Sequence, residues 1–244
     1  MALLEARGMV QMFGEFTALD GVDFDVEAGQ FHGLVGPNGS GKSTLMKCIA
    51  GAIAPTRGQV RFAGVDITRR RPDERAHAGM SIKFQITGTM SKLSVYDNVL
   101  LATQARGTML DLLRSRTRGA LHDHIMESLA RFKLVERAHD LAGVLSHGQQ
   151  QWLEIAMALA SEPRLLLLDE PTAGMSLEER KATGELLLPL QTSCTMVIVE
   201  HDLDFIRDIC DMLTVLDQGR VVGSGTVTEM QQNPRVQEVF LSRV

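Results

Sequence analysis

Apolar residues recur along this chain with two periods, and the change between them predicts where strands and helices lie. From Gly8 to Phe31 apolar and polar residues alternate, which is typical of antiparallel strands. Shorter apolar runs further along indicate buried strands, and the second of them also fits a hairpin. These runs are Phe31–Val35, Gln59–Ile67, Met80–Gln85, Leu165–Leu168, Thr195–Val199 and Met212–Leu216.

Apolar positions with a helical period fill the intervals between these strands. The helical stretches are Lys42–Ala54, a block from Val95 to about Ala160, Glu178–Leu190 and Leu203–Ile209. Inside the block, the basic segment Gly107–Gly119 predicts a loop or a short helix. The alternation of strand and helix after Arg164 implies a parallel α/β sheet.

This order of elements predicts one α/β domain over residues 1–244. Residues 1–85 and 161–244 are expected to form a core with a β subdomain, and residues 86–160 an inserted helical lobe. The chain has 244 residues, which is enough to bury a full core, and it contains no internal repeat and no low-complexity linker.

The composition adds limits on function. With 44% apolar and 23% charged residues, the chain is an ordinary soluble globule. Its 25 basic and 30 acidic residues give a net charge of −5, which argues against a nucleic-acid binder because neutralising phosphates requires a basic face. The clusters Arg69–Arg71 and Arg114–Arg118 leave a local basic patch open, with a solvated loop as the alternative.

Cysteine usage and hydropathy predict a cytosolic location unless a partner ties the chain to a membrane. Cys48, Cys194 and Cys210 lie in apolar patterns without CxxC spacing, as small core residues do in a reducing compartment. No apolar run is long enough to span a bilayer, and the start of the chain lacks the layout of a signal peptide.

A glycine-rich loop follows the predicted strand Phe31–Val35 and fits the pattern G-x-x-x-x-G-K-[ST]. Its glycines let consecutive N–H groups wrap phosphates, Lys42 reaches the β- and γ-phosphates, and Ser43 coordinates Mg²⁺. The strand before it and the helix after it favour a phosphate loop over a purely structural turn. The candidate nucleotide-binding residues are Gly36, Asn38, Gly39, Ser40, Gly41, Lys42, Ser43 and Thr44.

Two acidic residues end the strand Leu165–Leu168 and supply the second half of a nucleotide-hydrolysing site. Asp169 is expected in the Mg²⁺ shell, and Glu170 is expected to polarise the attacking water. Apolar strands often end in an acid, so the specificity of this pattern comes from its pairing with the phosphate loop.

Three further residues are candidates with a structural alternative beside each. Gln85 follows a strand and can contact Mg²⁺ or the attacking water, or simply cap a loop. His201 lies at the carboxyl edge of the predicted sheet, where ligands bind, and can hydrogen-bond a γ-phosphate or have a structural role. Phe13 is either a core aromatic or a surface on which adenine stacks.

A second candidate phosphate-binding segment lies far along the chain from the phosphate loop. It has the sequence LSHGQQ, at Leu145–Gln150. A Ser-x-Gly turn that opens a helix leaves N–H groups and a hydroxyl free to hold an anion. The candidate residues are Ser146, Gly148 and Gln149. Two phosphate-binding segments of different sequence suggest that each nucleotide is held between two copies of the protein.

Together these motifs resemble those of the ATP-binding subunit of an ABC transporter. They occur in the same order and at approximately the same spacing as in that family, and they extend over nearly the whole chain. They are the phosphate loop, Gln85, the signature segment Leu145–Gln149, Asp169-Glu170 and His201, with Phe13 at the position of the adenine-stacking aromatic. The resemblance implies a P-loop NTPase (RecA-like) fold, with a mixed-sheet core, an antiparallel β subdomain and an inserted α-helical lobe.

The resemblance also implies how the subunit works. ATP and Mg²⁺ would bind in a head-to-tail dimer, each ATP lying between the phosphate loop of one copy and Ser146 and Gly148 of the other. The second ATPase would be an identical copy or a paralogue. The helical lobe would contact transmembrane permease subunits, with Ile86–Asn98 as the hinge, on the cytoplasmic face of the inner membrane. A periplasmic solute-binding protein would take part indirectly, and no nucleic acid is expected.

Finer sequence features resemble those of the ATPase subunits of importers for branched-chain amino acids, or for urea and short amides. They are LSHGQQQWLEI, DEPTAGMS, the length and the C-terminal NPRVQEVFLSRV. Two positions depart from the general family. His147 replaces a glycine of the signature, which predicts that this turn keeps ordinary dihedral angles. Ser176 replaces an acidic residue that normally crosses the dimer interface, so the two ATP sites are expected to communicate differently.

Three other functions compete with import. A soluble ABC ATPase acting on nucleic acid or ribosomes usually has two cassettes or a long coiled coil, and neither is present. A P-loop kinase for a small molecule would require an Arg-rich lid and has no use for Leu145–Gln150. Exporters usually fuse the membrane and ATPase domains in one chain.

Overall fold

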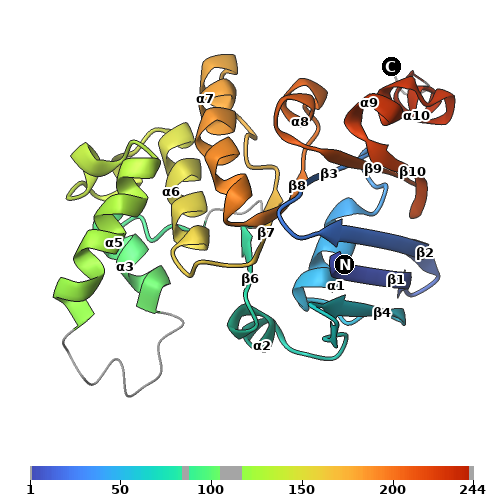
Figure 1. The fold of residues 1–244 in the computed structure, drawn as a ribbon, viewed down its shortest axis with the longest axis horizontal. Coiled ribbons are helices and arrows are strands. Elements are labelled where there is room, and N and C mark those ends of the chain that lie inside the picture. The colour runs from blue at the N-terminus through green and yellow to red at the C-terminus, as the bar shows by residue number, and fades with distance from the viewer. Residues whose placement is uncertain (1, 84–87, 105–116, 242–244) are drawn as a thin grey trace.

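Two sheets organise the computed structural model, which describes residues 2–83, 88–104 and 117–241 (Figure 1). The first is antiparallel, with the strand order β2-β1-β4-β5. It contains β1 (Ala2–Phe13), β2 (Phe16–Glu27), β4 (Arg57–Phe62) and β5 (Val65–Asp66). The second has the order β10-β9-β3-β8-β7-β6 and is parallel except for β10. It contains β3 (Phe31–Val35), β6 (Met80–Lys83), β7 (Leu165–Asp169), β8 (Thr195–Val199), β9 (Met212–Asp217) and β10 (Arg220–Thr226).

Helices cover the second sheet and extend beyond one end of it. The helices are α1 (Lys42–Ala50), α2 (Pro72–His77), α3 (Val95–Gln104), α5 (Thr117–Arg131), α6 (His147–Leu159), α7 (Leu177–Leu187), α8 (Leu203–Ile209), α9 (Val227–Gln232) and α10 (Pro234–Leu241). Short 3₁₀ turns lie at Val135–Arg137, Ala142–Val144 and Leu188–Thr192. Helices α3, α5 and α6 lie together at one end (Figure 1), inserted between the neighbouring parallel strands β6 and β7.

The core explains why the central strands are continuously apolar. All five residues of β7 and of β8 are buried. Because side chains alternate along a strand, Leu166 and Leu168 join the cluster formed with the helices, whereas Leu165 and Leu167 join the cluster beneath the antiparallel sheet. Both faces of the sheet are therefore covered, and the edge of the sheet where these strands end is left to carry polar residues.

The predicted fold class is confirmed, and several boundaries differ. The helix predicted for Lys42–Ala54 ends at Ala50, because Gly51 takes a left-handed φ of 80°. The run Gln59–Ile67 is a hairpin that begins earlier, at Arg57. The prediction missed β10, α2, α9 and α10.

Two predicted segments are only partly covered by the described residues. The strand predicted for Met80–Gln85 ends at Lys83, and Gln85 lies outside the described residues. Of Gly107–Gly119, the part from Thr117 belongs to α5 and the rest lies outside them.

The prediction that the cysteines are core residues is confirmed. The apolar character of the described helices also agrees with that of the sequence. Cys48, Cys194 and Cys210 are free and buried. Within the described ranges, no helix has the length and apolar character required to cross a membrane.

A buried histidine in β3 makes stability depend on pH. His32 is 2% exposed, and its Nε2 lies 2.8 Å from Thr214 Oγ1. Burial lowers the pKa of His32 from 6.5 to about 4, because the imidazolium form is poorly solvated there. The folded chain thus binds a proton less readily than the unfolded chain. At neutral pH this histidine does not lower the free energy of unfolding. As the pH falls from about 6.5 to about 4, the free energy of unfolding decreases.

We expect this loss to be on the order of 3 kcal/mol. Urea unfolding of the wild type and of His32→Gln, between pH 7 and pH 4, measures it. The glutamine cannot be charged but keeps an amide to bond Thr214, so the difference in stability between the two proteins should shift in favour of the variant as the pH falls. A difference independent of pH would contradict the assignment.

Candidate active site

The loop between β3 and α1 can be formed only with glycine at two positions. Gly41, with φ of 107°, precedes the first residue of α1, and a Cβ there would lie 2.7 Å from Ala18 O. Gly36 has φ of 151°, and a Cβ there would lie 2.1 Å from Leu216 O. The loop is pressed against β2 and β9, so its N–H groups are held at the N-terminus of α1, where anions bind.

Lys42 is the buried cation of this loop. Its Nζ donates hydrogen bonds to Gly36 O at 2.8 Å and Pro37 O at 2.9 Å. Burial lowers the pKa of Lys42, whereas the charges of Glu170 and Asp169 raise it. The structure thus brings the predicted phosphate lysine and the predicted acidic pair within electrostatic reach of one another.

The other candidate loop residues surround this lysine. Asn38, Gly39 and Ser43 are exposed, and Thr44 is half-buried. Ser40 is 2% exposed, and its Oγ has no hydrogen-bond partner among the described residues. The loop therefore presents both a buried hydroxyl and accessible polar groups.

Asp169 ends β7 as a buried carboxylate. It is 5% exposed, and its Oδ1 has no hydrogen-bond partner within the part of the chain that the structure describes. Burial raises the pKa of Asp169, the charge of Glu170 raises it further, and Lys83, Lys47 and Lys42 oppose the rise. This oxygen of the carboxylate is therefore left without a hydrogen bond by the described residues.

Glu170 and His201, which were predicted independently, are in direct contact. His201 Nε2 lies 2.8 Å from Glu170 Oε1, with the two side chains 44% and 19% exposed. Glu170 has φ of 50°, an unfavourable region for a residue with a Cβ, and its N–H donates to Val199 O at 2.9 Å. The strained backbone holds the carboxylate at the edge of the sheet beside the histidine.

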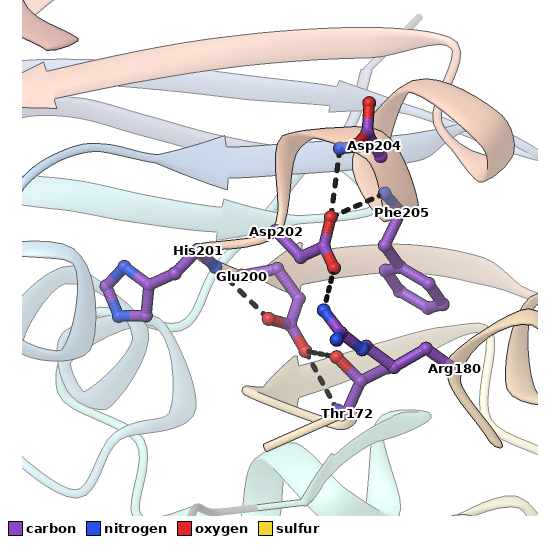
Figure 2. A network of polar contacts seen from close by, with 7 residues as sticks. All are labelled: Thr172, Arg180, Glu200, His201, Asp202, Asp204 and Phe205. Atoms are coloured by element: carbon purple, nitrogen blue, oxygen red, sulfur yellow. Dashed lines mark hydrogen bonds and ion pairs between the residues drawn. The ribbon is translucent and has the colours of Figure 1, made fainter. Parts of the chain in front are cut away.

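A network that the sequence prediction missed fixes the loop carrying His201 (Figure 2). The buried Glu200 accepts hydrogen bonds from Thr172 N at 2.8 Å, Thr172 Oγ1 at 2.6 Å and His201 N at 3.1 Å. Asp202 caps α8 and pairs with Arg180 of α7. The chain after β7 and the chain after β8 are therefore tied together. The only local signal was that acids flank His201 on both sides.

The signature segment Leu145–Gln149 forms the N-terminus of α6. Ser146 Oγ accepts from Gln149 N at 3.2 Å, and Gln149 Oε1 accepts from Ser146 N at 3.1 Å, which is a reciprocal capping box. His147 is the first residue of the helix, so the predicted ordinary dihedral angles are confirmed. Gly148 is buried, and a Cβ on it would lie 2.4 Å from Glu179 Oε1.

The structure does not bring every predicted residue together. Among the described residues, no hydrogen bond or ion pair joins Ser146, Gly148 or Gln149 to the phosphate loop. Phe13 is 49% exposed at the tip of the β1–β2 hairpin and pairs with Phe16, which is 64% exposed and was not predicted. Gln85 lies outside the described residues.

The residues of this site fit an Mg²⁺ ion that is bound partly by the protein and partly by the phosphates of a substrate. No three His, Cys, Asp or Glu side chains gather into a metal-binding group in the described ranges. Among the described residues, the chain offers the exposed Ser43 and Asp169 Oδ1, which has no hydrogen-bond partner there. Such a sparse oxygen set suits Mg²⁺, which keeps several waters and is bound by one or two carboxylates together with substrate phosphates.

Comparison with known proteins agrees with this site. The family model described as ABC transporter matches residues 19–173. The branched-chain amino acid transport ATP-binding protein BraF of Pseudomonas aeruginosa is 31% identical, over 98% of this chain and 97% of BraF. The methionine import ATP-binding protein MetN of Streptomyces coelicolor is 36% identical, over 90% of this chain and 63% of MetN.

Solved structures agree as well. An ATP-binding cassette of an ABC transporter in its ADP conformation superposes with a TM-score of 0.89 at 31% identity and covers 100% of both chains. A dimeric cassette in a post-hydrolysis state, bound to ADP and Pi, has a TM-score of 0.80 at 26% identity and covers 92% of this chain and 98% of that one. Since the family model spans more than half of the chain and BraF nearly all of it, the chain belongs to the ABC transporter family, as one of its ATPases.

Proposed function

We propose that this chain hydrolyses ATP to drive an ABC importer, with Glu170 as the catalytic base. The observation that carries the proposal is the 2.8 Å contact between Glu170 and His201 beside the phosphate-loop lysine. A carboxylate oriented by an imidazole can accept the proton of the attacking water, and the lysine stabilises charge on the phosphates.

The roles of the remaining residues follow from their positions or, for Gln85, which lies outside the described residues, from the order of the motifs alone. Lys42 exchanges its contacts with Gly36 O and Pro37 O for phosphate oxygens, while the loop N–H groups and Asn38 surround the phosphates. Ser43, Asp169 and Gln85 hold Mg²⁺, which neutralises phosphate charge when bound. Adenine stacks on Phe13.

Each ATP lies between two subunits in this proposal. The support is that Ser146, Gly148 and Gln149 lie at the N-terminus of α6 and, among the described residues, form no hydrogen bond or ion pair with their own phosphate loop. A related cassette bound to ADP and Pi is dimeric. The second ATPase is an identical copy or a paralogue.

The partners and location follow from the importer assignment. We propose that residues 86–160 form the lobe that receives the transmembrane permease subunits, with Ile86–Asn98 as the contact, and that residues 1–85 and 161–244 form the core. The chain is then peripheral to the cytoplasmic face of the membrane, and a periplasmic solute-binding protein delivers the solute.

For the solute, we propose a branched-chain amino acid, or urea or a short amide. The support is the likeness to BraF over nearly the full length and the sequence LSHGQQQWLEI. Uptake of labelled leucine and of labelled urea, in cells that carry or lack the gene, tests this, with a Glu170→Gln chain as the inactive control. Uptake of neither solute would contradict the proposed solute class.

Two rival functions have distinct signatures. An ATPase acting on nucleic acid would fail to co-purify with membranes, and a small-molecule kinase would yield a phosphorylated acceptor instead of free phosphate. The net charge of −5 supports import over the first.

The dimer model predicts a specific effect of Ser146→Ala. Loss of a hydroxyl that donates to a phosphate of the other subunit's ATP should lower turnover about ten- to a hundredfold, while ATP binding to the monomer is unchanged. Phosphate release and titration with a fluorescent ATP analogue measure the two quantities.

The control must account for the cap that Ser146 also provides, since losing an N-cap alone destabilises a helix by about 1 kcal/mol. Thr226→Ala removes a capping box of the same design from α9, and Thr226 is not a candidate site residue. We expect Thr226→Ala to lower stability similarly and to leave turnover unchanged. Equal turnover in Ser146→Ala and the wild type would rule out the model in which each ATP lies between two subunits.

A further inference from the structure

We propose that His147 is a positioning residue that fastens the turn Ala173–Ser176, here called the linking turn, to the start of α6. The inference rests on the proposed dimer, in which the two ends of this link serve different ATP molecules. His147 Nε2 lies 2.9 Å from Ala173 O. A glycine, which the general family pattern has at this position, has no side chain that could make the bond.

The fit around the ring is close. Gly174 has φ of 75°, and a Cβ on it would lie 3.0 Å from His147 Nε2 and 3.2 Å from Cδ2. A side chain at position 174 would therefore both strain the backbone and displace the imidazole. His147 and Gly174 are matched to one another, which gives the unusual residue of the signature segment a structural partner.

The bond to a carbonyl requires an N–H at Nε2. The neutral tautomer with the proton on Nε2 provides it, and so does the imidazolium. The link is therefore a mechanical connection between the start of α6 and the linking turn.

Other contacts extend the junction between α6 and α7. Trp152 Nε1 donates to Thr183 Oγ1 at 2.8 Å, and Thr183 Oγ1 donates to Glu179 O at 2.8 Å. Ser176 caps α7 in a box with Glu179. Further along α6 and α7 the two helices are thus already joined, and His147 adds the bond that ties the start of the linking turn to the N-terminus of α6.

Ala173, the residue of the linking turn that His147 contacts, is also attached to the hydrolytic site of its own subunit. Ala173 N donates to Glu170 O at 3.3 Å, and the preceding Thr172 is held by Glu200, which also accepts from His201 N. In the proposed dimer, Ser146 faces the ATP of the partner, whereas Glu170 faces the subunit's own ATP. One hydrogen bond from His147 therefore connects the residues that serve the two sites.

This connection supplies a route that Ser176 does not. The family's acidic residue at that position crosses the interface, whereas Ser176 turns its hydroxyl to Glu179 N at 3.2 Å and caps its own helix. Communication between the sites would then run inside each subunit through the side chain of His147.

The link itself is tested on the nucleotide-free protein by hydrogen exchange. We expect His147→Ala to accelerate amide exchange in the linking turn about fivefold, the effect of losing one ordinary hydrogen bond. His147→Gln places an amide N–H near the position of Nε2 and should restore slow exchange. Acrylamide quenching of Trp152, the chain's one tryptophan, should be the same in all three proteins because its contacts lie further along the junction.

The coupling is tested by the ATP dependence of hydrolysis. We expect His147→Ala to lower the Hill coefficient towards 1 and to lower kcat, with unchanged ATP binding to the monomer, and His147→Gln to recover both values. Equal exchange in all three proteins would overturn the proposal, and so would a His147→Ala protein with the wild-type Hill coefficient and kcat. Absence of ATP turnover in the wild type would contradict the proposed function instead, and the exchange experiment would still decide whether the link exists.

Discussion

Glu170→Gln is expected to lower ATP turnover by two to four orders of magnitude, the usual contribution of a positioned general base. Glutamine has nearly the shape of glutamate and can still accept a hydrogen bond from His201 Nε2, but it cannot take up a proton from water. The backbone strain at φ of 50° is the same for both residues, so the change is confined to the chemistry. ATP binding should persist, and an ATP-bound dimer should accumulate.

Single-turnover phosphate release and analytical ultracentrifugation with ATP measure these effects. Glu185→Gln is the matched control, since it removes the same charge from an exposed position on α7 and should leave turnover unchanged. A Glu170→Gln protein that keeps wild-type turnover, or that forms no ATP-bound dimer, would show that the base has been assigned wrongly.

The second large effect is expected for Glu154→Gln, which should lower the free energy of unfolding by about 3 kcal/mol or more. Glu154 of α6 and Lys83 of β6 form a buried ion pair, with Nζ and Oε2 3.4 Å apart and the side chains 2% and 5% exposed for lysine and glutamate. The distance is that of an ion pair, although the atoms do not meet hydrogen-bond geometry. Without this carboxylate, Lys83 stays buried and loses its ion-pair partner, and, among the described residues, only the charges of Asp169 and Glu200 still oppose the lowering of its pKa by burial.

The same carboxylate receives a second contact, from Gly88 N to Oε1 at 2.7 Å. The Glu154 carboxylate thereby joins the described residues Lys83 and Gly88 to α6. Glutamine keeps an oxygen for Gly88, so the variant isolates the loss of charge. The double variant Lys83→Met with Glu154→Gln removes both charges and should recover most of the stability. Urea unfolding measures all three proteins, and a Glu154→Gln variant within about 0.5 kcal/mol of the wild type, the range of neutral surface changes, would contradict this account.

Local motifs explain which parts of the site could be predicted. The phosphate loop and the pair Asp169-Glu170 are continuous in sequence, and their residue types follow from the chemistry of phosphates. The contacts of Lys83 with Glu154, of Glu200 with Thr172 and of His147 with Ala173 join residues far apart in the chain, and no local pattern encodes them. Among elements, β10 was missed because its glycines interrupt the apolar alternation, and α2 because six residues are too few to establish a period.

Helix α6, which is joined to α7 through Trp152 and Thr183, bears the signature segment at its N-terminus. The chain after its C-terminus is bonded to the residue that precedes β6, with Arg164 N donating to Gly79 O at 2.8 Å. The helix has 13 residues and is therefore a rigid arm of roughly 20 Å. Rotating such an arm by about 10° about its C-terminal end displaces Ser146 by roughly 3 Å, the length of a hydrogen bond. In the proposed importer, a permease that tilts the lobe only slightly would therefore engage or release the proposed phosphate contact of Ser146 without unfolding any part of the subunit.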